Sequence, residues 1–503
     1  MELLSNLANG FGLLVGLPQI TAIIIGVILG ILAGAMPGLS PSMGVALLVP
    51  FTYKMHPSVA LILLASIYIA ANYGGSITAV TINTPGTPSA VVTSFDGYPL
   101  TRKGKPGLAL GTSLVASTVG GIIGTIILIF FSIPLAKLAV KLHPAEYFAL
   151  AMFGLTTVAS LGGKNWAKAF IAAMLGLLIN TIGIDPISGV SRFTFGFFRL
   201  YDGFSLIPAL IGLFALSEVF LRLEEHKFAK KVSADTTFKK EEWPSIKEYW
   251  KLKFSILRSS IIGTLIGIFP GAGATIAAFL SYDVAKRSSK HPETFGTGNP
   301  EGVAAAEAAN SSSVGGALVP LLTLGIPGSA TTAVLIGALM IHDLNPGPLL
   351  FKTNPDIVYS LFASLLVANF VMLVLGLWGS RLWVKVTKIP KNVLFPMIIT
   401  ISIIGSFAVN YSFFDVASCL GFGVLGWILK KYGFPPAPIV LGIVLGKLAE
   451  ENFRRAVIMG GYSVFFTRPA SLIMLIVALL SFSYPLIKTA RERKVSRAAD
   501  SDR

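Results

Sequence analysis

Three long stretches of the sequence contain no acidic or basic side chain, and they constrain the fold more than any other feature. No Asp, Glu, Lys or Arg occurs between Leu3 and Tyr53, between Met55 and Phe95, or between Pro106 and Ala136. Each stretch exceeds the roughly 20 residues that cross a hydrocarbon core. Only 13% of all residues are charged, whereas soluble domains carry roughly 25%. The sequence therefore predicts an integral membrane protein with many spans.

Charge and motif content exclude several classes of function. The net charge is +16, but the Lys and Arg residues lie mainly in short loops and in the C-terminal tail, as the positive-inside rule predicts. The sequence contains no basic stripe with interleaved aromatic residues, the pattern that would indicate a nucleic-acid partner. The single cysteine, Cys419, excludes an intrachain disulfide and a Cys-based zinc site. No phosphate-binding loop or catalytic motif is present, so we expect no catalytic residue, no ATP hydrolysis and no cofactor.

The apolar stretches predict an all-α polytopic fold with about 10 to 12 transmembrane or re-entrant elements. A charged segment at 223–253 divides the chain and is expected to be a cytoplasmic linker. It separates a first membrane repeat, 1–222, from a second, 254–487, and residues 488–503 form a basic tail, also expected to be cytoplasmic. The first apolar stretch lacks a basic n-region and is predicted to remain as a membrane segment.

Two Pro-Gly motifs of the first half recur in the second. The segment 34–38 (GAMPG) reappears at 267–271 (GIFPG), and 84–89 (TPGTPS) reappears at 326–331 (IPGSAT). A glycine pair precedes the later motif in both halves, at 74–75 and at 315–316. The first copy follows a stretch without Lys or Arg, and the second follows the basic linker. Because matching flanks differ in basic residues, the positive-inside rule places them on opposite sides of the membrane, which predicts two inverted repeats, an arrangement common among secondary transporters.

A Pro-Gly pair inside an apolar segment breaks the helix, because Pro removes a backbone donor and Gly permits unusual dihedral angles. In lipid, the freed backbone groups persist only where they line a buried polar cavity. The N-termini of the resulting half-helices carry partial positive charge and free amides, which suit a carboxylate. Ordinary kinks are the alternative interpretation. We predict a substrate site at Ser40, Ser42, Thr84, Gly86, Thr87, Ser89, Gly271, Gly273, Thr275, Gly328, Ser329 and Thr331.

Three further polar residues lie close to these motifs and are candidates for ion coupling. Asn72 and Asn310 precede the glycine pairs in the two halves, and Glu307 lies in the small-residue run before Asn310. An amide or a carboxylate at such a place is suited to sodium or proton coupling. Helix–helix hydrogen bonding by the amides, or solvation of Glu307 at a helix end, are the alternatives. The histidines lack metal-ligand spacing, so no metal beyond a sodium ion is expected.

At these motifs the chain resembles the large membrane subunit of the tripartite tricarboxylate transporter family. The resemblance spans nearly the whole chain. It is carried by 34–48 (GAMPGLSPSMGVALL), 83–89 (NTPGTPS), 270–275 (PGAGAT), 302–310 (GVAAAEAAN) and 325–332 (GIPGSATT).

The resemblance implies a permease of the bacterial inner membrane that imports small carboxylates, such as citrate, by symport with sodium or protons. It also implies two partners, a small four-helix membrane subunit and a periplasmic solute-binding protein; whether the chain forms a homodimer is left open. An intramembrane enzyme acting on a lipid-linked substrate and a passive anion channel are the rival interpretations. The shared motifs do not encode which carboxylate is carried.

Overall fold

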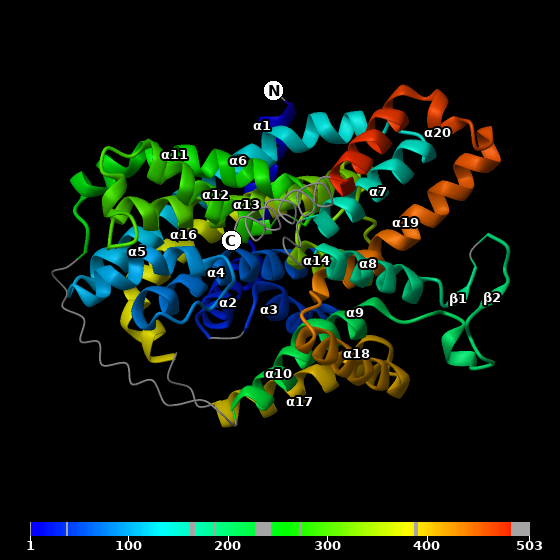
Figure 1. The fold of residues 1–503 in the computed structure, drawn as a ribbon, viewed down its shortest axis with the longest axis horizontal. Helices are drawn as coiled ribbons and strands as arrows, with labels where there is room; N and C mark the ends of the chain where they lie inside the picture. Colours follow the sequence, from blue (N-terminus) through cyan, green and yellow to red (C-terminus); the bar gives the residue numbers. More distant parts are fainter. Residues whose placement is uncertain are drawn as a thin grey trace, which may run out of the picture.

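The computed structural model describes residues 2–36, 39–160, 166–185, 187–226, 243–271, 273–386 and 391–483. Most of the predicted linker, 227–242, and the predicted basic tail lie outside these ranges. The described chain is almost entirely helical (Figure 1), which confirms the all-α prediction apart from one short antiparallel hairpin of β1 (Gly183–Ile184) and β2 (Ser191–Arg192).

The first half of the chain contains the following elements: α1 (Glu2–Leu13), α2 (Leu17–Ala35), α3 (Pro41–Leu48), η1 (Val49–Thr52), α4 (Pro57–Ile82), α5 (Ala90–Arg102), α6 (Pro106–Ala139), α7 (Pro144–Ser160), α8 (Trp166–Asn180), η3 (Phe198–Leu200), α9 (Leu206–Leu210), η4 (Ile211–Leu216) and α10 (Ser217–His226). The last three join into one helix with a π-helical turn at η4.

The second half contains α11 (Ile246–Ile268), α12 (Gly273–Ser288), η6 (Pro292–Thr294), α13 (Pro300–Leu324), α14 (Ala330–Ile341), α15 (Leu350–Thr353), α16 (Pro355–Val386), α17 (Lys391–Asn410), α18 (Phe413–Lys431), α19 (Pro436–Gly460) and α20 (Val464–Thr467). A further apolar helix follows at Pro469–Ser483.

Among the described residues, seven helices are long and apolar enough to cross a membrane. They are Leu17–Ala35, Pro57–Ile82, Pro106–Ala139, Leu206–Glu224, Pro355–Gly379, Asn392–Asn410 and Phe413–Lys431. Shorter apolar helices, among them α8 and α14, accompany these spans. The chain is therefore a multi-pass membrane protein that contains both long helices and shorter apolar ones.

Glycines hold α2 against α4 and α11 against α13 at backbone contact. A Cβ atom at Gly34 would lie 2.1 Å from the carbonyl oxygen of Ala71, and one at Gly267 would lie 2.4 Å from that of Ser313. Gly74 and Gly316 face these two glycines from the partner helices. Small residues allow such close approach, which supplies the van der Waals contact that drives helix association in lipid. The two halves thus pack their first long helices in the same way.

One end of the molecule contains the start of α4 and the end of α13. Thr52, shortly before α4, has its hydroxyl oxygen 3.4 Å from Nε2 of His342. The loop after His342 places the carbonyl oxygen of Pro346 beside Gly325, which ends α13 in a left-handed conformation at φ 71°. The start of one long helix therefore lies near the end of the other.

The opposite end contains the end of α5 and the start of α13. The Asp96 carboxylate on α5 accepts hydrogen bonds from the backbone N–H groups of Gly298 and Asn299, both at 2.8 Å, just before α13 begins. Trp243, which follows the undescribed part of the linker, lies beside Gly111 near the start of α6 at this end. Because α5 follows α4 directly, α4 and α13 run antiparallel.

The C-terminal helices of the two halves are exchanged. α19 of the second half packs on α7 and α8 of the first, whereas η4 and α10 of the first half pack on α18 of the second (Figure 1). The β1–β2 hairpin projects from the right-hand end of the molecule in Figure 1. Arg192 pairs with Glu450 at 2.5 Å, and Asp185 with Arg454 at 2.6 Å, which ties the hairpin to α19.

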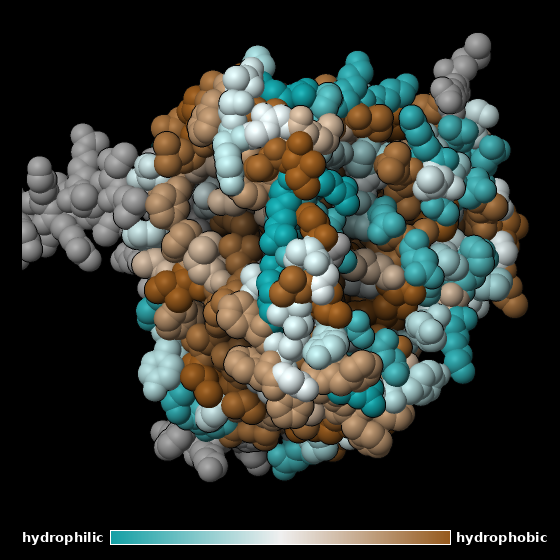
Figure 2. Space-filling model, turned by 90° about the vertical axis from the view of Figure 1, so that its right-hand side faces the viewer, coloured by the Kyte–Doolittle hydropathy of each residue, from teal (hydrophilic) through white to brown (hydrophobic). Residues whose placement is uncertain are grey.

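Hydrophilic surface is mixed with hydrophobic surface on the face that carries the hairpin (Figure 2). The hydrophilic part includes charged side chains of the hairpin and of α19, among them Arg192 and Arg454. The hydrophobic part includes the exposed rings of Phe195 and Phe198. Charged groups avoid the hydrocarbon core. The hairpin end is therefore one of the two water-facing ends of the molecule.

Candidate functional site

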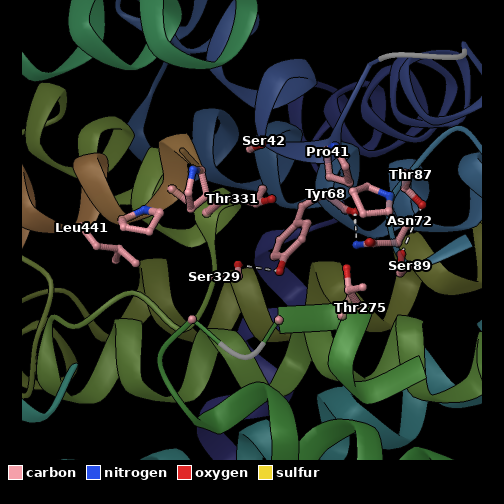
Figure 3. A pocket seen from close by; sticks show the side chains of 18 of the residues that line it. Pro41, Ser42, Tyr68, Asn72, Thr87, Ser89, Thr275, Ser329, Thr331 and Leu441 are labelled. Carbon is pink, nitrogen blue, oxygen red and sulfur yellow. Dashed lines mark hydrogen bonds between the residues drawn. The ribbon is translucent and has the colours of Figure 1, made fainter. Parts of the chain in front are cut away.

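A cavity of about 420 Å³ lies where the N-terminal ends of α3, α5, α12 and α14 meet (Figure 3). Two residues of α4, the start of α19 and one residue of α8 complete its wall. We call it the central cavity. Its lining comprises Pro41, Ser42, Tyr68, Asn72, Thr87, Pro88, Ser89, Ala169, Gly271, Gly273, Ala274, Thr275, Ser329, Ala330, Thr331, Pro435, Ala437, Pro438 and Leu441.

The sequence dictates where three of the four helices begin. Ser40 caps α3 by accepting a hydrogen bond from the backbone N–H of Met43 at 3.2 Å, and Pro41 supplies the fixed φ of the first turn. Ser329 caps α14 in the same way through the N–H of Thr332. The chain reaches α12 through Gly271 and Gly273, both in the left-handed region, which glycine adopts without strain. Each loop thus ends by directing a helix N-terminus at the cavity.

Hydroxyl groups and one amide provide the polar surface of the central cavity. The Tyr68 hydroxyl lies 2.9 Å from that of Ser329, and the Thr87 hydroxyl lies 3.1 Å from that of Ser89. Asn72 donates its Nδ2 to the carbonyl oxygen of Tyr68 at 3.0 Å. No described residue of the lining carries a charge. Positive potential in the cavity therefore comes from helix N-termini, each equivalent to about half an elementary charge.

The structure brings most of the predicted site residues together. The coupling candidate Asn72 lines the central cavity, and so do eight of the twelve predicted site residues, three from the first half and five from the second: Ser42, Thr87, Ser89, Gly271, Gly273, Thr275, Ser329 and Thr331. Ser40 and Gly86 line an adjoining cavity instead. Thr84 and Gly328 line neither of these two cavities.

Gly86 and Gly328 hold their loops against neighbouring helices. A Cβ atom at Gly86 would lie 1.9 Å from the carbonyl oxygen of Gly34, and one at Gly328 would lie 2.7 Å from the Cα atom of Ala317. The N–H of Gly86 donates to the carbonyl oxygen of Gly75 at 3.1 Å, which fixes the loop on α4. Both glycines are thus required for loop packing rather than for contact with a bound molecule in the central cavity.

Glu307, the predicted coupling carboxylate, is fully buried on α13. It accepts hydrogen bonds from the hydroxyls of Thr93 on α5 and Ser117 on α6, the latter at 2.8 Å. No basic side chain forms an ion pair with it among the described residues. The structure therefore places this carboxyl group away from both water and the central cavity, and not at a solvated helix end.

Asn310 connects the surroundings of Glu307 to the central cavity. It lies one turn after Glu307, and its Nδ2 donates to the backbone oxygen of Asn72 at 3.3 Å, while the Asn72 side chain lines the cavity. The Oδ1 atom of Asn310 is buried and accepts no hydrogen bond within the described part of the chain. A buried amide oxygen without a donor is an available ligand for a cation or a water molecule.

Sequence reasoning missed the contributions of Tyr68, α8 and the start of α19. Tyr68 is a single phenol within an apolar helix, and no local pattern distinguishes it. The start of α19 did carry a signal, because Gly433 at φ 76° and Pro435-Pro436 mark a helix start in another apolar stretch. That this start faces the Pro-Gly loops follows only from the packing of α19 on α8.

The helices and the cavity define a class of protein, a multi-pass membrane permease with broken helices around an uncharged internal cavity. Comparison with known proteins gives the family. The sequence pattern of the Tripartite tricarboxylate transporter TctA family matches residues 20–441, and the chain belongs to this family. It is accordingly a non-enzymatic permease subunit of a tripartite tricarboxylate transport system, which excludes the intramembrane enzyme.

Two relatives from Agrobacterium vitis match the chain. A protein described as an uncharacterized 52.8 kDa protein in the TAR-I ttuC' 3' region is 38% identical over 496 residues, which cover 98% of both chains. An uncharacterized protein in the TAR-II ttuC' 3' region is 38% identical over 234 residues, which cover 46% of this chain and 97% of that protein. No solved structure matches the chain.

Proposed function

We propose that this chain imports small di- or tricarboxylates by ion-gradient-driven symport, and that the central cavity binds the substrate. One observation carries the proposal: four helix N-termini and a set of hydroxyls converge on a cavity whose described lining has no charged side chain. Free amides and helix dipoles favour an anion there without a fixed counter-charge. Such a site can bind the anion and release it, because no ion pair has to be broken.

The two halves act as inverted repeats in this proposal. The antiparallel course of α4 and α13 and the duplicated contacts of Gly34 and Gly267 support it. The end that leads into the linker also carries Lys103, Lys105, Lys286 and Arg287, so the positive-inside rule assigns it to the cytoplasm. The hairpin end then faces the periplasm of a bacterial inner membrane, where a solute-binding protein delivers the substrate.

A tripartite system implies two partner proteins besides this chain. We propose a small four-helix membrane subunit and the periplasmic solute-binding protein as these partners. Sodium is the proposed coupling ion, and a proton is the alternative. Asn72, Asn310 and Glu307 are the proposed coupling residues, because they form one connected group between the central cavity and a buried carboxyl.

Uptake by the complete three-component system, reconstituted in vesicles, tests the proposal. A panel of di-, tri- and aromatic carboxylates is measured with and without a sodium gradient, and again with a proton gradient. We expect accumulation of at least one carboxylate above its external concentration, and its loss when the gradient is collapsed. Equilibration without accumulation indicates a passive channel, and the absence of transport of every carboxylate rejects the substrate class.

Thr331→Val and Ser89→Ala test the cavity itself, since each removes a hydroxyl from the lining with little change in shape. Loss of one hydrogen bond to a charged ligand reduces affinity about 10-fold, so we expect KM to rise by that factor. Thr84→Val is the matched control from the same loop, because Thr84 lines neither cavity. An equal KM in all three variants contradicts the assignment of the cavity.

A further inference from the structure

A second cavity, of about 410 Å³, adjoins the central cavity. The two share Ser42, Thr87 and Pro88 in their walls, so they meet at the start of α3 and at the loop before α5. We call the second one the release cavity. Its far wall belongs to α10 and α18, the pair of helices formed by exchange between the two halves.

That far wall carries charge, unlike the wall of the central cavity. The Nζ atom of Lys430 lies 2.9 Å from one carboxylate oxygen of Glu218, and the Nε atom of Arg222 lies 2.9 Å from the other. Glu218 therefore divides its two oxygens between two cationic groups. All three side chains line the release cavity.

Lys430 retains capacity for a second anionic partner. Its ammonium group has three N–H donors, and one oxygen of a shared carboxylate is its acidic partner among the described residues. Its side chain is 14% exposed, so the ammonium group is largely buried and has little contact with bulk water. A charge-assisted hydrogen bond in such a place is about twice as strong as a neutral one. The group is thus suited to a carboxylate that enters from the central cavity.

The position of the release cavity fits a path toward the linker side. The N–H of Ile184 in β1 donates to the carbonyl oxygen of Tyr201, and the Ser205 hydroxyl donates to Asp415 at 2.9 Å, so α9 and α18 both start beside the hairpin. The helix α9–α10 and α18 run from there toward the opposite end, so Arg222 and Lys430 lie on the side that the Lys and Arg distribution assigns to the cytoplasm. A substrate that leaves the central cavity past Thr87 and Ser42 meets Lys430 next. Neutral groups thus bind the anion first, and cationic groups receive it second.

We propose that the release cavity is a second substrate site, in which Lys430 and Arg222 bind a carboxylate of a di- or tricarboxylate on the cytoplasmic side and Glu218 is the resident counter-ion that the substrate displaces. This rests on the proposed function. Glu218 keeps the cations paired while the cavity is empty, and its return to Lys430 expels the anion. Two adjoining sites allow a bound molecule to move forward in steps.

Transport from the cytoplasmic side tests the proposal. The three-component system is placed in inside-out vesicles, and the carboxylate found active in the uptake panel is added outside. Lys430→Met keeps the length of the side chain and removes its charge; we expect KM on this side to rise about 10-fold, the loss of one charged hydrogen bond. Lys431→Met is the matched control, because Lys431 is half exposed, pairs with Glu224 and lines neither cavity. We expect its KM to stay within twofold of wild type.

Glu218→Gln separates a binding role from a structural ion pair. In a binding role, Glu218→Gln frees Lys430 for the substrate, so the cytoplasmic-side KM falls while that of Lys430→Met rises. If Lys430 and Glu218 form only a structural ion pair, Lys430→Met and Glu218→Gln both impair transport and neither lowers the cytoplasmic-side KM; this result overturns the proposal. Equal KM values for Lys430→Met and Lys431→Met overturn it as well. The wild-type control distinguishes this failure from failure of the proposed function, in which no carboxylate is transported at all.

Discussion

The hydroxyl of Tyr68 on α4 lies 2.9 Å from the hydroxyl of Ser329, the N-cap of α14. This hydrogen bond joins the two halves of the chain across the central cavity (Figure 3). Ser329 also accepts from the N–H of Thr332, so the same hydroxyl caps a helix and faces the cavity. Any molecule that binds to Ser329 therefore competes with, or is positioned by, Tyr68.

Tyr68→Phe should weaken substrate binding without unfolding the protein, because it removes only a hydroxyl. We expect KM for the transported carboxylate to rise about 3- to 10-fold, in line with one hydrogen bond, with the amount of protein in the membrane unchanged. Tyr147→Phe is the control, because its hydroxyl donates to the carbonyl oxygen of Ala139 on the neighbouring α6 and lines no part of the cavity. Uptake kinetics of both variants check the prediction, and an unchanged KM for Tyr68→Phe contradicts it.

Glu307→Gln should separate transport from coupling. The amide keeps the shape of the buried side chain but cannot bind a proton or present a negative charge to a cation. We expect exchange of labelled for unlabelled substrate across the membrane to persist within about twofold, while gradient-driven accumulation is lost, because the substitution removes the charge and keeps the shape of the side chain.

Glu301→Gln provides the comparison on the same helix. Glu301 lies at the start of α13, where it accepts a hydrogen bond from Ser289 and is partly exposed. Its replacement should leave both exchange and accumulation intact. Accumulation by Glu307→Gln at the wild-type level would show that this carboxyl has a structural role only.

Gly263→Val should destabilise the protein through overpacking between α11 and α13. A Cβ atom at Gly263 would lie 2.4 Å from the carbonyl oxygen of Ala309. Forcing methyl groups into such a contact typically costs about 1–3 kcal/mol, so we expect a lower midpoint of thermal unfolding in detergent. Gly421→Ala on α18 has no atom within 4 Å of its new Cβ. It should leave the midpoint unchanged or raise it, because alanine favours helix by about 1 kcal/mol.

Asp185→Asn should loosen the β1–β2 hairpin in a pH-dependent manner. The backbone N–H of Ile187 donates to the Asp185 carboxylate at 2.9 Å and Arg454 donates at 2.6 Å; these bonds lower the pKa of Asp185 below its usual range. A lowered pKa means that the stabilisation is fully present above the unfolded-state pKa, about 3.9, and is lost as the pH falls through the lower folded value.

Hydrogen–deuterium exchange of the hairpin measures this effect. At neutral pH we expect faster exchange in Asp185→Asn than in the wild type, and a difference that shrinks below about pH 4. Asp202→Asn is the control in the same segment, because Asp202 forms no ion pair with any described residue. Equal exchange of Asp185→Asn and wild type at pH 7 contradicts the prediction.

The membrane class and the breaks in the helices could be predicted from the sequence, because both depend on local composition. An uncharged stretch such as 55–95 cannot be solvated, and Pro-Gly at 85–86 or 327–328 cannot continue a helix.

Two features could not be predicted in this way. The exchange of α19 and α10 between the halves depends on which apolar surfaces fit each other, and every such surface in this chain has a similar composition.

The second feature that could not be predicted from the sequence is the register, that is, which residue of the first half corresponds to which residue of the second. The sequence places Asn72 and Asn310 at comparable positions, each shortly before a glycine pair. In the register in which Gly74 and Gly316 make equivalent contacts, the residue that corresponds to Asn310 is Tyr68. The Asn310 side chain instead donates to the backbone oxygen of Asn72 across the interface, so the two residues do not occupy matching places. The alignment by backbone contacts therefore differs by one helical turn from the alignment by sequence motif, and a motif of two glycines is too short to distinguish the two alignments.

The sequence by itself determined that the chain crosses the membrane, where its helices break and that the breaks are duplicated, because hydrophobic length and the dihedral limits of Pro and Gly act within a few residues. Only the tertiary structure decided that Ser42, Thr87, Ser329 and Thr331 share one cavity, that Ser40 and Gly86 belong to a second, and that Lys430 meets Glu218 there. Those relationships join residues hundreds of positions apart, and they depend on side-chain packing between helices.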